Sequence, residues 1–452
     1  MPLDLLIRNG LVVTPDGVRP LDVGVADGAI VELAAGLGGS AREEVDAAGL
    51  HVFPGLIDAH VHFNEPGRTD WEGFDTGSAA LAAGGGTCFF DMPLNAHPPT
   101  LDGPSFDLKR AAAEASSRTD FALWGGLTPD NLDKLKELAD RGVVGFKAFM
   151  SNSGIDDFGR ADDLTLYRGM QAAARLGLPV VVHAESEELT GRLTAEARAA
   201  GRRGVRDYLN SRPILAEVDA IRRAILFAAE TRCSLHVVHI SSTAGLDAVA
   251  EARRAGANVT GETCPHYLAL SADDVERIGA AAKCAPPLRP ADEVELMWLQ
   301  LEAGGFDLVA SDHSPAPASL KTDSDFFKVW GGIAGVQSTR SVLLSRDPPL
   351  ALALVARLTS SAPAERFGIK AKGTLAIGQD ADLALVEIAA SYALRRDDLL
   401  DRHRLSPYVG RSFRGVTRRT IVRGHMVFRD GRTVGDFRGR FLAPTRREAA
   451  GA

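Results

Sequence analysis

The chain has 452 residues, of which 45% are hydrophobic and 24% are charged. This composition supplies a large buried core and excludes a disordered or low-complexity protein. The length suits about three average domains, but it equally suits one α/β barrel of about 250 residues with a smaller module beside it.

The charge balance, membrane-span pattern and cysteine spacing all indicate an ordinary globular protein. The 51 basic and 59 acidic side chains give a net charge of −8, which offers no attraction to nucleic acids or anionic membranes. No segment approaches the roughly 18 apolar residues of a membrane span, and no secretion signal is present at the N-terminus. Cys88, Cys233, Cys264 and Cys284 lack the spacing of metal-binding pairs and the density of a disulfide scaffold. We therefore expect a cytoplasmic protein without nucleic-acid or membrane partners.

The two ends of the chain share one pattern. Residues 1–53 alternate short β-type runs with glycine-containing turns, which predicts a small antiparallel sheet. The same pattern returns in 373–386 and 420–427. We predict that 1–53 and 368–452 combine into one small β-sandwich domain.

Between these ends, apolar runs alternate with helical stretches, which is typical of βα units around a parallel sheet. Helical spacing of apolar residues is visible at 218–228 and 244–255. The eight strand candidates are 55–63, 86–95, 120–127, 143–150, 179–185, 234–242, 258–267 and 307–314. Eight such units predict a TIM-like (β/α)8 barrel over residues 54–367, and a doubly wound open sheet is the alternative.

Ligand-type side chains stand at the carboxyl ends of several predicted strands, where barrel enzymes carry their catalytic groups. The first strand ends in His60 and His62, which share one face because side chains alternate along a strand. His183, His239 and Asp312 follow apolar runs in the fifth, sixth and eighth strands. A single strand histidine is commonly an ordinary core residue, but the assembly in one register predicts a metal site.

Lys147 lies inside the apolar fourth strand, where an ammonium ion would lose its hydration. A buried neutral amine can react with carbon dioxide to form an anionic carbamate, whose two oxygens can bridge two cations. Four neutral imidazoles and one aspartate carry too little negative charge for two divalent ions. We therefore predict that Lys147 is carboxylated and bridges two metals.

The chemistry of such a centre is hydrolysis. A water held between two divalent cations would lose a proton near neutral pH and become a nucleophile. Asp312 is the predicted general base, because it is placed to ligate one ion, accept that proton and deliver it to a leaving nitrogen.

Together with the flanking β segments, these residues resemble the cyclic amidohydrolases of the amidohydrolase superfamily over the whole chain. The resemblance implies two divalent ions, usually zinc, with cobalt, manganese, iron or nickel as alternatives. It also implies a homo-oligomer, with a tetramer favoured. All six ligand positions are filled, which favours an enzyme over relatives that have lost their metal ligands. The implied ligands are His60, His62, carboxylated Lys147 and Asp312 for one ion, and Lys147, His183 and His239 for the other.

Motifs distinguish the branches of this family. Members that open dihydroorotate share an arginine, a threonine and a histidine. At the corresponding positions this chain has Asn64, Asn95 and Ala316, respectively. Hydantoin-opening members carry a tyrosine five residues after the lysine, where this chain has Asn152. Segments 62–68, 71–73, 329–333 and 406–410 instead resemble the branch that hydrolyses allantoin, a small uncharged ureide, to allantoate. Hydantoins, dihydropyrimidines and dihydroorotate stay open as alternative substrates.

Candidates for substrate contacts lie just beyond strand ends. They are Asn95, Ser314 and the backbone of Cys284 and Ala285, with a turn or packing role as the alternative for each. His236 precedes His239 by three residues, so side-chain alternation predicts that it faces the surrounding helices.

Overall fold

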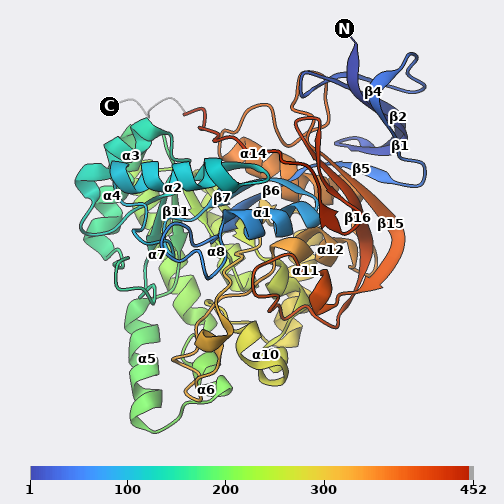
Figure 1. Cartoon of the computed structure of the whole chain (residues 1–452). Helices are drawn as coiled ribbons and strands as arrows, with labels where there is room; N and C mark the ends of the chain where they lie inside the picture. Colours follow the sequence, from blue (N-terminus) through green and yellow to red (C-terminus); the bar gives the residue numbers. More distant parts are fainter. Residues whose placement is uncertain (1, 447–452) are drawn as a thin grey trace.

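Residues 2–446 are described by the computed structural model, in which helices surround central strands (Figure 1), and the pairing of these parallel strands makes a ring. Two sheets of hydrogen-bonded neighbours form the ring, β6-β7-β8 and β9 to β14. Their bounds are β6 (Leu56–Val61), β7 (Gly86–Asp91), β8 (Asp120–Leu123), β9 (Gly125–Gly126), β10 (Phe146–Phe149), β11 (Val180–His183), β12 (Leu235–Val237), β13 (Val259–Thr263) and β14 (Leu308–Val309). Because β8 and β9 are two halves of the third predicted strand, all eight predicted strands are confirmed.

Contacts between the first and last strands close the ring. Val61 forms a parallel bridge with His313, and the backbone N–H of His62 donates to the carbonyl of His313 at 2.7 Å. Asp58 Oδ1 accepts from the backbone N–H of Ser311 at 3.0 Å. The structure is therefore a closed barrel, and the open-sheet alternative is wrong.

Helices cover the outside of the barrel (Figure 1). Short polar side chains begin several of them: Asp102, Asp162 and Ser242 accept backbone N–H groups at the starts of α2, α4 and α8. The predicted helices at 218–228 and 244–255 are confirmed as α7 and α8. The bounds are α1 (Phe74–Ala83), α2 (Gly103–Ser116), α3 (Leu135–Arg141), α4 (Asp163–Arg175), α5 (Glu187–Ala199), α6 (Val205–Asn210), α7 (Ile214–Thr231), α8 (Thr243–Arg254), α9 (Pro265–Ala269), α10 (Ala272–Ile278), α11 (Ala291–Glu302), α12 (Thr339–Leu344), α13 (Leu352–Ala356) and α14 (Ala362–Arg366).

The two ends of the chain form one nine-stranded sheet, seen in Figure 1 as blue and red strands side by side. The strands pair in the order β18-β17-β16-β15-β5-β1-β2-β3, with β4 beside β1, so the module is one continuous hydrogen-bonded sheet. Antiparallel pairing of β5 with β15, such as Val52 opposite Leu385, joins the two ends. The strands are β1 (Leu3–Thr14), β2 (Gly17–Ala26), β3 (Ala29–Ala34), β4 (Ala41–Asp46), β5 (His51–Pro54), β15 (Leu383–Ala393), β16 (Ser412–Val422), β17 (His425–Arg429) and β18 (Arg432–Thr433).

Apolar side chains fill the barrel interior. Ile57, Phe90, Trp124 and Val181 belong to one buried cluster with Phe367, which follows α14. The Phe367 ring meets the Trp124 ring edge-on, with centroids 5.0 Å apart. This packing supports the carboxyl ends of the strands, where the polar residues lie.

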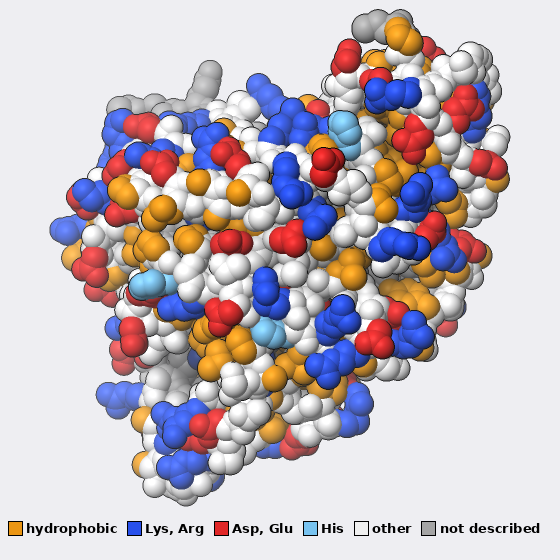
Figure 2. Space-filling view, in the orientation of Figure 1, with side chains coloured by type: hydrophobic (Ala, Val, Ile, Leu, Met, Phe, Trp, Pro, Cys, Tyr) orange, Lys and Arg blue, Asp and Glu red, His pale blue; other side chains and the backbone are white. Residues whose placement is uncertain are grey.

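The surface shows no segregation of charge on the face drawn in Figure 2, where basic and acidic side chains are interspersed. The four cysteines are buried and carry free thiols. Among residues 2–446, no helix combines the length and the apolar character needed to cross a membrane.

Candidate metal centre

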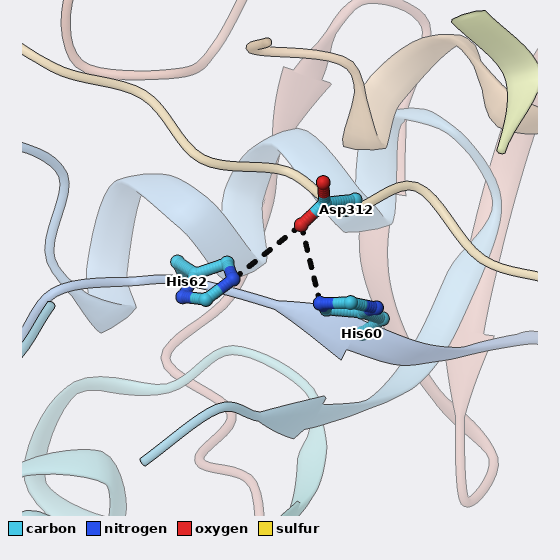
Figure 3. A group of neighbouring side chains, drawn as sticks. All are labelled: His60, His62 and Asp312. Atoms are coloured by element: carbon cyan, nitrogen blue, oxygen red, sulfur yellow. Dashed lines mark ion pairs between the residues drawn. The ribbon is translucent and has the colours of Figure 1, made fainter. Parts of the chain in front are cut away.

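His60, His62 and Asp312 converge at the seam between the first and last barrel strands (Figure 3). Asp312 Oδ1 lies 3.2 Å from His60 Nε2 and 3.4 Å from His62 Nε2. His60 lies on β6, His62 directly follows it, and Asp312 lies three residues beyond β14 in a turn with φ 47°. One cation could contact all three side chains, because their ligand atoms lie within 4.8 Å of one another.

His183 and His239 form a second pair beside the first. His183 ends β11, and its Nδ1 lies 3.0 Å from Nε2 of His239. The ring of His239 also lies 5.5 Å from that of His60, centroid to centroid, so the two groups adjoin. Burial lowers the pKa of His60, His183 and His239, which keeps these imidazoles neutral and able to donate a lone pair to a metal.

Lys147 lies among these histidines. Its side chain is fully buried on β10, and its Nζ has no hydrogen-bond partner within residues 2–446. Burial lowers the pKa of Lys147 to about 8, so that a substantial fraction of the amine is neutral near physiological pH. An unpartnered buried amine beside neutral imidazoles and a carboxylate is a donor set that fits two divalent cations bridged by a carbamate.

Two buried glutamates that the sequence analysis missed contact these histidines. Glu185 Oε2 lies 2.8 Å from His183 Nε2 and also pairs with Arg212. Burial opposes ionisation of Glu185, but Arg212 and His183 lower its pKa to about 2. Glu262 Oε1 lies 2.7 Å from His60 Nδ1; burial raises the pKa of Glu262 to about 8, and Lys147 opposes this rise. The available signal was a buried acidic residue, on a barrel strand for Glu262 and just beyond a strand for Glu185, which requires a partner.

The prediction that His236 faces the helices is wrong. Its Nε2 lies 3.0 Å from Glu262 Oε2, and its ring meets Phe367 of the barrel interior edge-on. Alternation fails because β12 ends at Val237 and His239 adopts φ 42°. The left-handed conformation of His239 turns its side chain to the interior, the side on which His236 already lies.

One cavity of about 260 Å³ is lined by all ten predicted site residues. The Asn95 amide donates to Ser314 Oγ at 3.3 Å, and the Cys284 carbonyl accepts from the Tyr208 hydroxyl at 2.8 Å. Asn152 also lines the cavity, but its side-chain oxygen accepts from the backbone of Gly154 within its own loop. The ten residues are His60, His62, Asn95, Lys147, His183, His239, Cys284, Ala285, Asp312 and Ser314.

The closed parallel barrel and the histidine-rich cavity at its strand ends are the two features that define the class of protein to which this chain belongs. The amidohydrolase family model matches residues 51–427, and the chain belongs to that family.

Curated relatives over nearly the full length of the chain are named as allantoinases. The chain is 57% identical over 449 residues to an allantoinase of Rubrobacter xylanophilus, with 98% of each protein covered. It is 53% identical over 447 residues to an allantoinase of Deinococcus radiodurans, which covers 98% of this chain and 99% of the relative. Among solved structures, the L-hydantoinase (dihydropyrimidinase) from Arthrobacter aurescens superposes with a TM-score of 0.95 at 33% identity, covering 98% of this chain and all of that one.

Proposed function

We propose that this protein hydrolyses the cyclic amide bond of allantoin to give allantoate. The observation that carries this proposal is the identity of up to 57% to allantoinases over nearly the full length. The cavity supports the proposal further. The candidate metal ligands and the proposed base converge in a space of about 260 Å³, which suits a small cyclic substrate.

In this proposal, two divalent cations occupy the cavity. His60, His62, Lys147 and Asp312 would hold one ion, and Lys147, His183 and His239 the other, with Lys147 carboxylated. Zinc fits this nitrogen and oxygen donor set, and cobalt, manganese, iron or nickel are alternatives. When bound, the cations polarise the ring carbonyl and lower the pKa of the attacking water.

Asp312 is the proposed general base. Its Oδ1 faces His60 and His62, while Oδ2 points away from both (Figure 3). Oδ2 accepts a proton from the water as the water oxygen bonds to the ring carbonyl carbon. The same proton passes to the ring nitrogen when the C–N bond breaks, which leaves a second ureido group and a carboxylic acid that releases its own proton to solvent to become the carboxylate.

The substrate contacts are proposed at Asn95, Ser314 and the backbone of Cys284 and Ala285. The side chains of Asn95 and Ser314 are hydrogen-bonded to each other at the cavity wall, where both can turn toward a ureido group of the substrate. Asn64, which replaces the arginine of dihydroorotate-opening members, donates to the carbonyl of Pro315 and adds no charge. A pocket without that cation suits uncharged allantoin.

We further propose a domain division at 1–53, 54–367 and 368–452, and a cytoplasmic homo-oligomer, with a tetramer favoured. Mixed surface charge on the face in Figure 2 supports the absence of nucleic-acid and membrane partners. Light scattering coupled to gel filtration would give the number of subunits directly.

A second candidate is hydantoin or dihydropyrimidine hydrolysis, which the TM-score of 0.95 to the L-hydantoinase favours. The test is steady-state kinetics of zinc-loaded protein on allantoin, hydantoin, dihydrouracil and dihydroorotate. We expect kcat/KM to be highest for allantoin. Rapid hydrolysis of another substrate with allantoin left intact would overturn the assignment and retain the chemistry.

A further inference from the structure

Three buried side chains and the half-buried Thr260 form a continuous chain of contacts to the candidate metal centre. Thr260 Oγ1 lies 2.8 Å from Nδ1 of His236, whose Nε2 lies 3.0 Å from Glu262 Oε2. The other oxygen of Glu262, Oε1, lies 2.7 Å from His60 Nδ1. His236, Glu262 and His60 are at most 1% exposed, so water does not compete for these contacts.

The proton positions in this chain are determined by the carboxylate. A bound cation would favour the ionised form of Glu262, and an ionised carboxylate only accepts hydrogen bonds, so the two imidazole nitrogens that face it would then both carry protons. The Nδ1 of His236 is then an acceptor, and the Thr260 hydroxyl is the group that donates to it. His60 is left with its proton on Nδ1 and a lone pair on Nε2, the atom that faces Asp312 and His62.

We propose that Glu262 is a positioning residue that fixes the tautomer and ring orientation of His60 for the cation shared with His62 and Asp312, and that His236 and Thr260 hold Glu262 in place. The inference deepens the proposed function and rests on its metal centre. Carboxylates that accept from the far nitrogen of a metal-binding histidine orient the ring and raise its basicity.

Among the rings of the candidate ligands, Glu262 contacts that of His60, at one of the two ion positions, and its carboxyl group meets His239 only at the backbone N–H. The other position has its own anchor, because Glu185 contacts His183 and is held by Arg212. His62 has no such anchor, since its Nδ1 lacks a partner within the described residues. Loss of Glu262 should therefore weaken one ion and leave the other in place.

The test measures zinc rather than turnover. Wild type, Glu262→Gln and Glu217→Gln are equilibrated with zinc and a competing chelator, and zinc per chain is counted by mass spectrometry. Glu217 is a matched control, because it is 1% exposed and accepts from Ser241 and Ser242 but contacts no candidate ligand. Glutamine keeps the size of Glu262 but replaces one accepting oxygen with a donor.

We expect Glu262→Gln to weaken one ion by about 10- to 100-fold, so that it retains about one zinc where wild type and Glu217→Gln retain two. Two ions at unchanged affinity in Glu262→Gln, or equal loss in Glu217→Gln, would overturn the inference and leave the proposed function standing. A wild type that binds no zinc would instead overturn the proposed function.

Thr260→Val tests the same series of contacts from Thr260 to His60 if the Glu262→Gln variant does not fold. It removes the outermost hydrogen bond and touches no candidate ligand. We expect one ion to bind about threefold or more weakly, a smaller effect than direct loss of the carboxylate. Unchanged affinity in a folded Thr260→Val would overturn the inference.

Discussion

Lys147 lies in an environment that is unusual for a lysine. Its amine is buried without a hydrogen-bond partner among residues 2–446, and burial lowers its pKa to about 8. Only the neutral amine reacts with carbon dioxide, and its fraction increases as pH rises through the pKa. Carboxylation should therefore become easier between pH 7 and pH 9.

This predicts a dependence of zinc reloading on carbon dioxide. Metal-free protein is mixed with zinc at pH 7, 8 and 9, at a fixed concentration of dissolved CO₂, and recovery of activity is followed. Recovery should require CO₂ and should accelerate with pH in proportion to the neutral amine. Recovery at equal rates with and without CO₂ would contradict a carbamate on Lys147.

Asp312 gives the second prediction at this scale. Asp312→Asn keeps an oxygen that can contact a cation but removes the proton acceptor, so kcat should fall by about 10²- to 10⁴-fold. Zinc must be counted in the same sample, so that loss of the base is separated from loss of metal. Asp157→Asn is the control, because Asp157 contacts Arg68 and His97 away from the candidate ligands. A zinc-loaded Asp312→Asn with wild-type kcat would exclude Asp312 as the base.

Single residues differ in how far the sequence reveals them. His183 and Asp312 were predictable because each follows an apolar run, where a polar side chain requires a reason. His236 was predicted wrongly because the left-handed backbone of His239 cannot be seen in a strand pattern. Glu262 was missed because its partners lie on β6 and β12, far away in sequence.

At the scale of elements, α1 packs closely against the segment that follows His62. A Cβ on Gly77 would lie 2.4 Å from Cδ1 of Phe63, so only glycine allows this approach. Phe63 also contacts Phe89 of β7, with ring centroids 4.6 Å apart, which leaves it little room to move. The helix therefore holds the backbone that carries His62.

Gly77→Ala should lower the free energy of unfolding by about 1–3 kcal/mol, as overpacking does in other cores. Gly191→Ala is the matched control in α5, because its Cβ would meet only the flexible end of Glu187, and it should be neutral or stabilising by up to about 1 kcal/mol. Urea unfolding of both variants measures the difference. Equal free energies of unfolding in the two variants would contradict this, because they would show that the Phe63 ring moves aside without cost.

Element positions were predictable, and their ends were less so. Apolar runs located all eight barrel strands, but 234–242 was predicted where β12 spans only Leu235–Val237. The strand stops early because the chain turns at His239 to reach Ser242, the N-cap of α8. The third strand divides at Trp124, whose indole N–H donates to the Ala59 carbonyl across the barrel.

At the scale of the whole molecule, a buried ion cluster joins the nine-stranded sheet to the barrel. Lys372 Nζ lies 2.9 Å from carboxylate oxygens of Asp120 and Asp380 and 2.6 Å from Asp382. Arg423 also pairs with Asp120, which begins β8 of the barrel. The residues converge from three regions of the sequence, so no local pattern predicts the cluster, although the β pattern at both ends did predict the shared sheet.

Lys372→Met should destabilise the protein by about 3–5 kcal/mol, because it leaves three carboxylates without their shared cation. Lys136→Met is the control: Lys136 forms an exposed pair with Asp140, and its loss should change stability by about 0.5 kcal/mol or less. Chemical denaturation compares the two. A Lys372→Met variant as stable as Lys136→Met would show that the cluster does not hold the sheet to the barrel.

The central claim, a two-ion centre that opens allantoin, is tested most directly by titrating zinc into metal-free protein while measuring allantoate formation. The account predicts negligible activity without zinc and a rise that reaches its plateau at two zinc ions per chain. Full activity without metal, or no allantoate at saturating zinc with both ions bound, would contradict it.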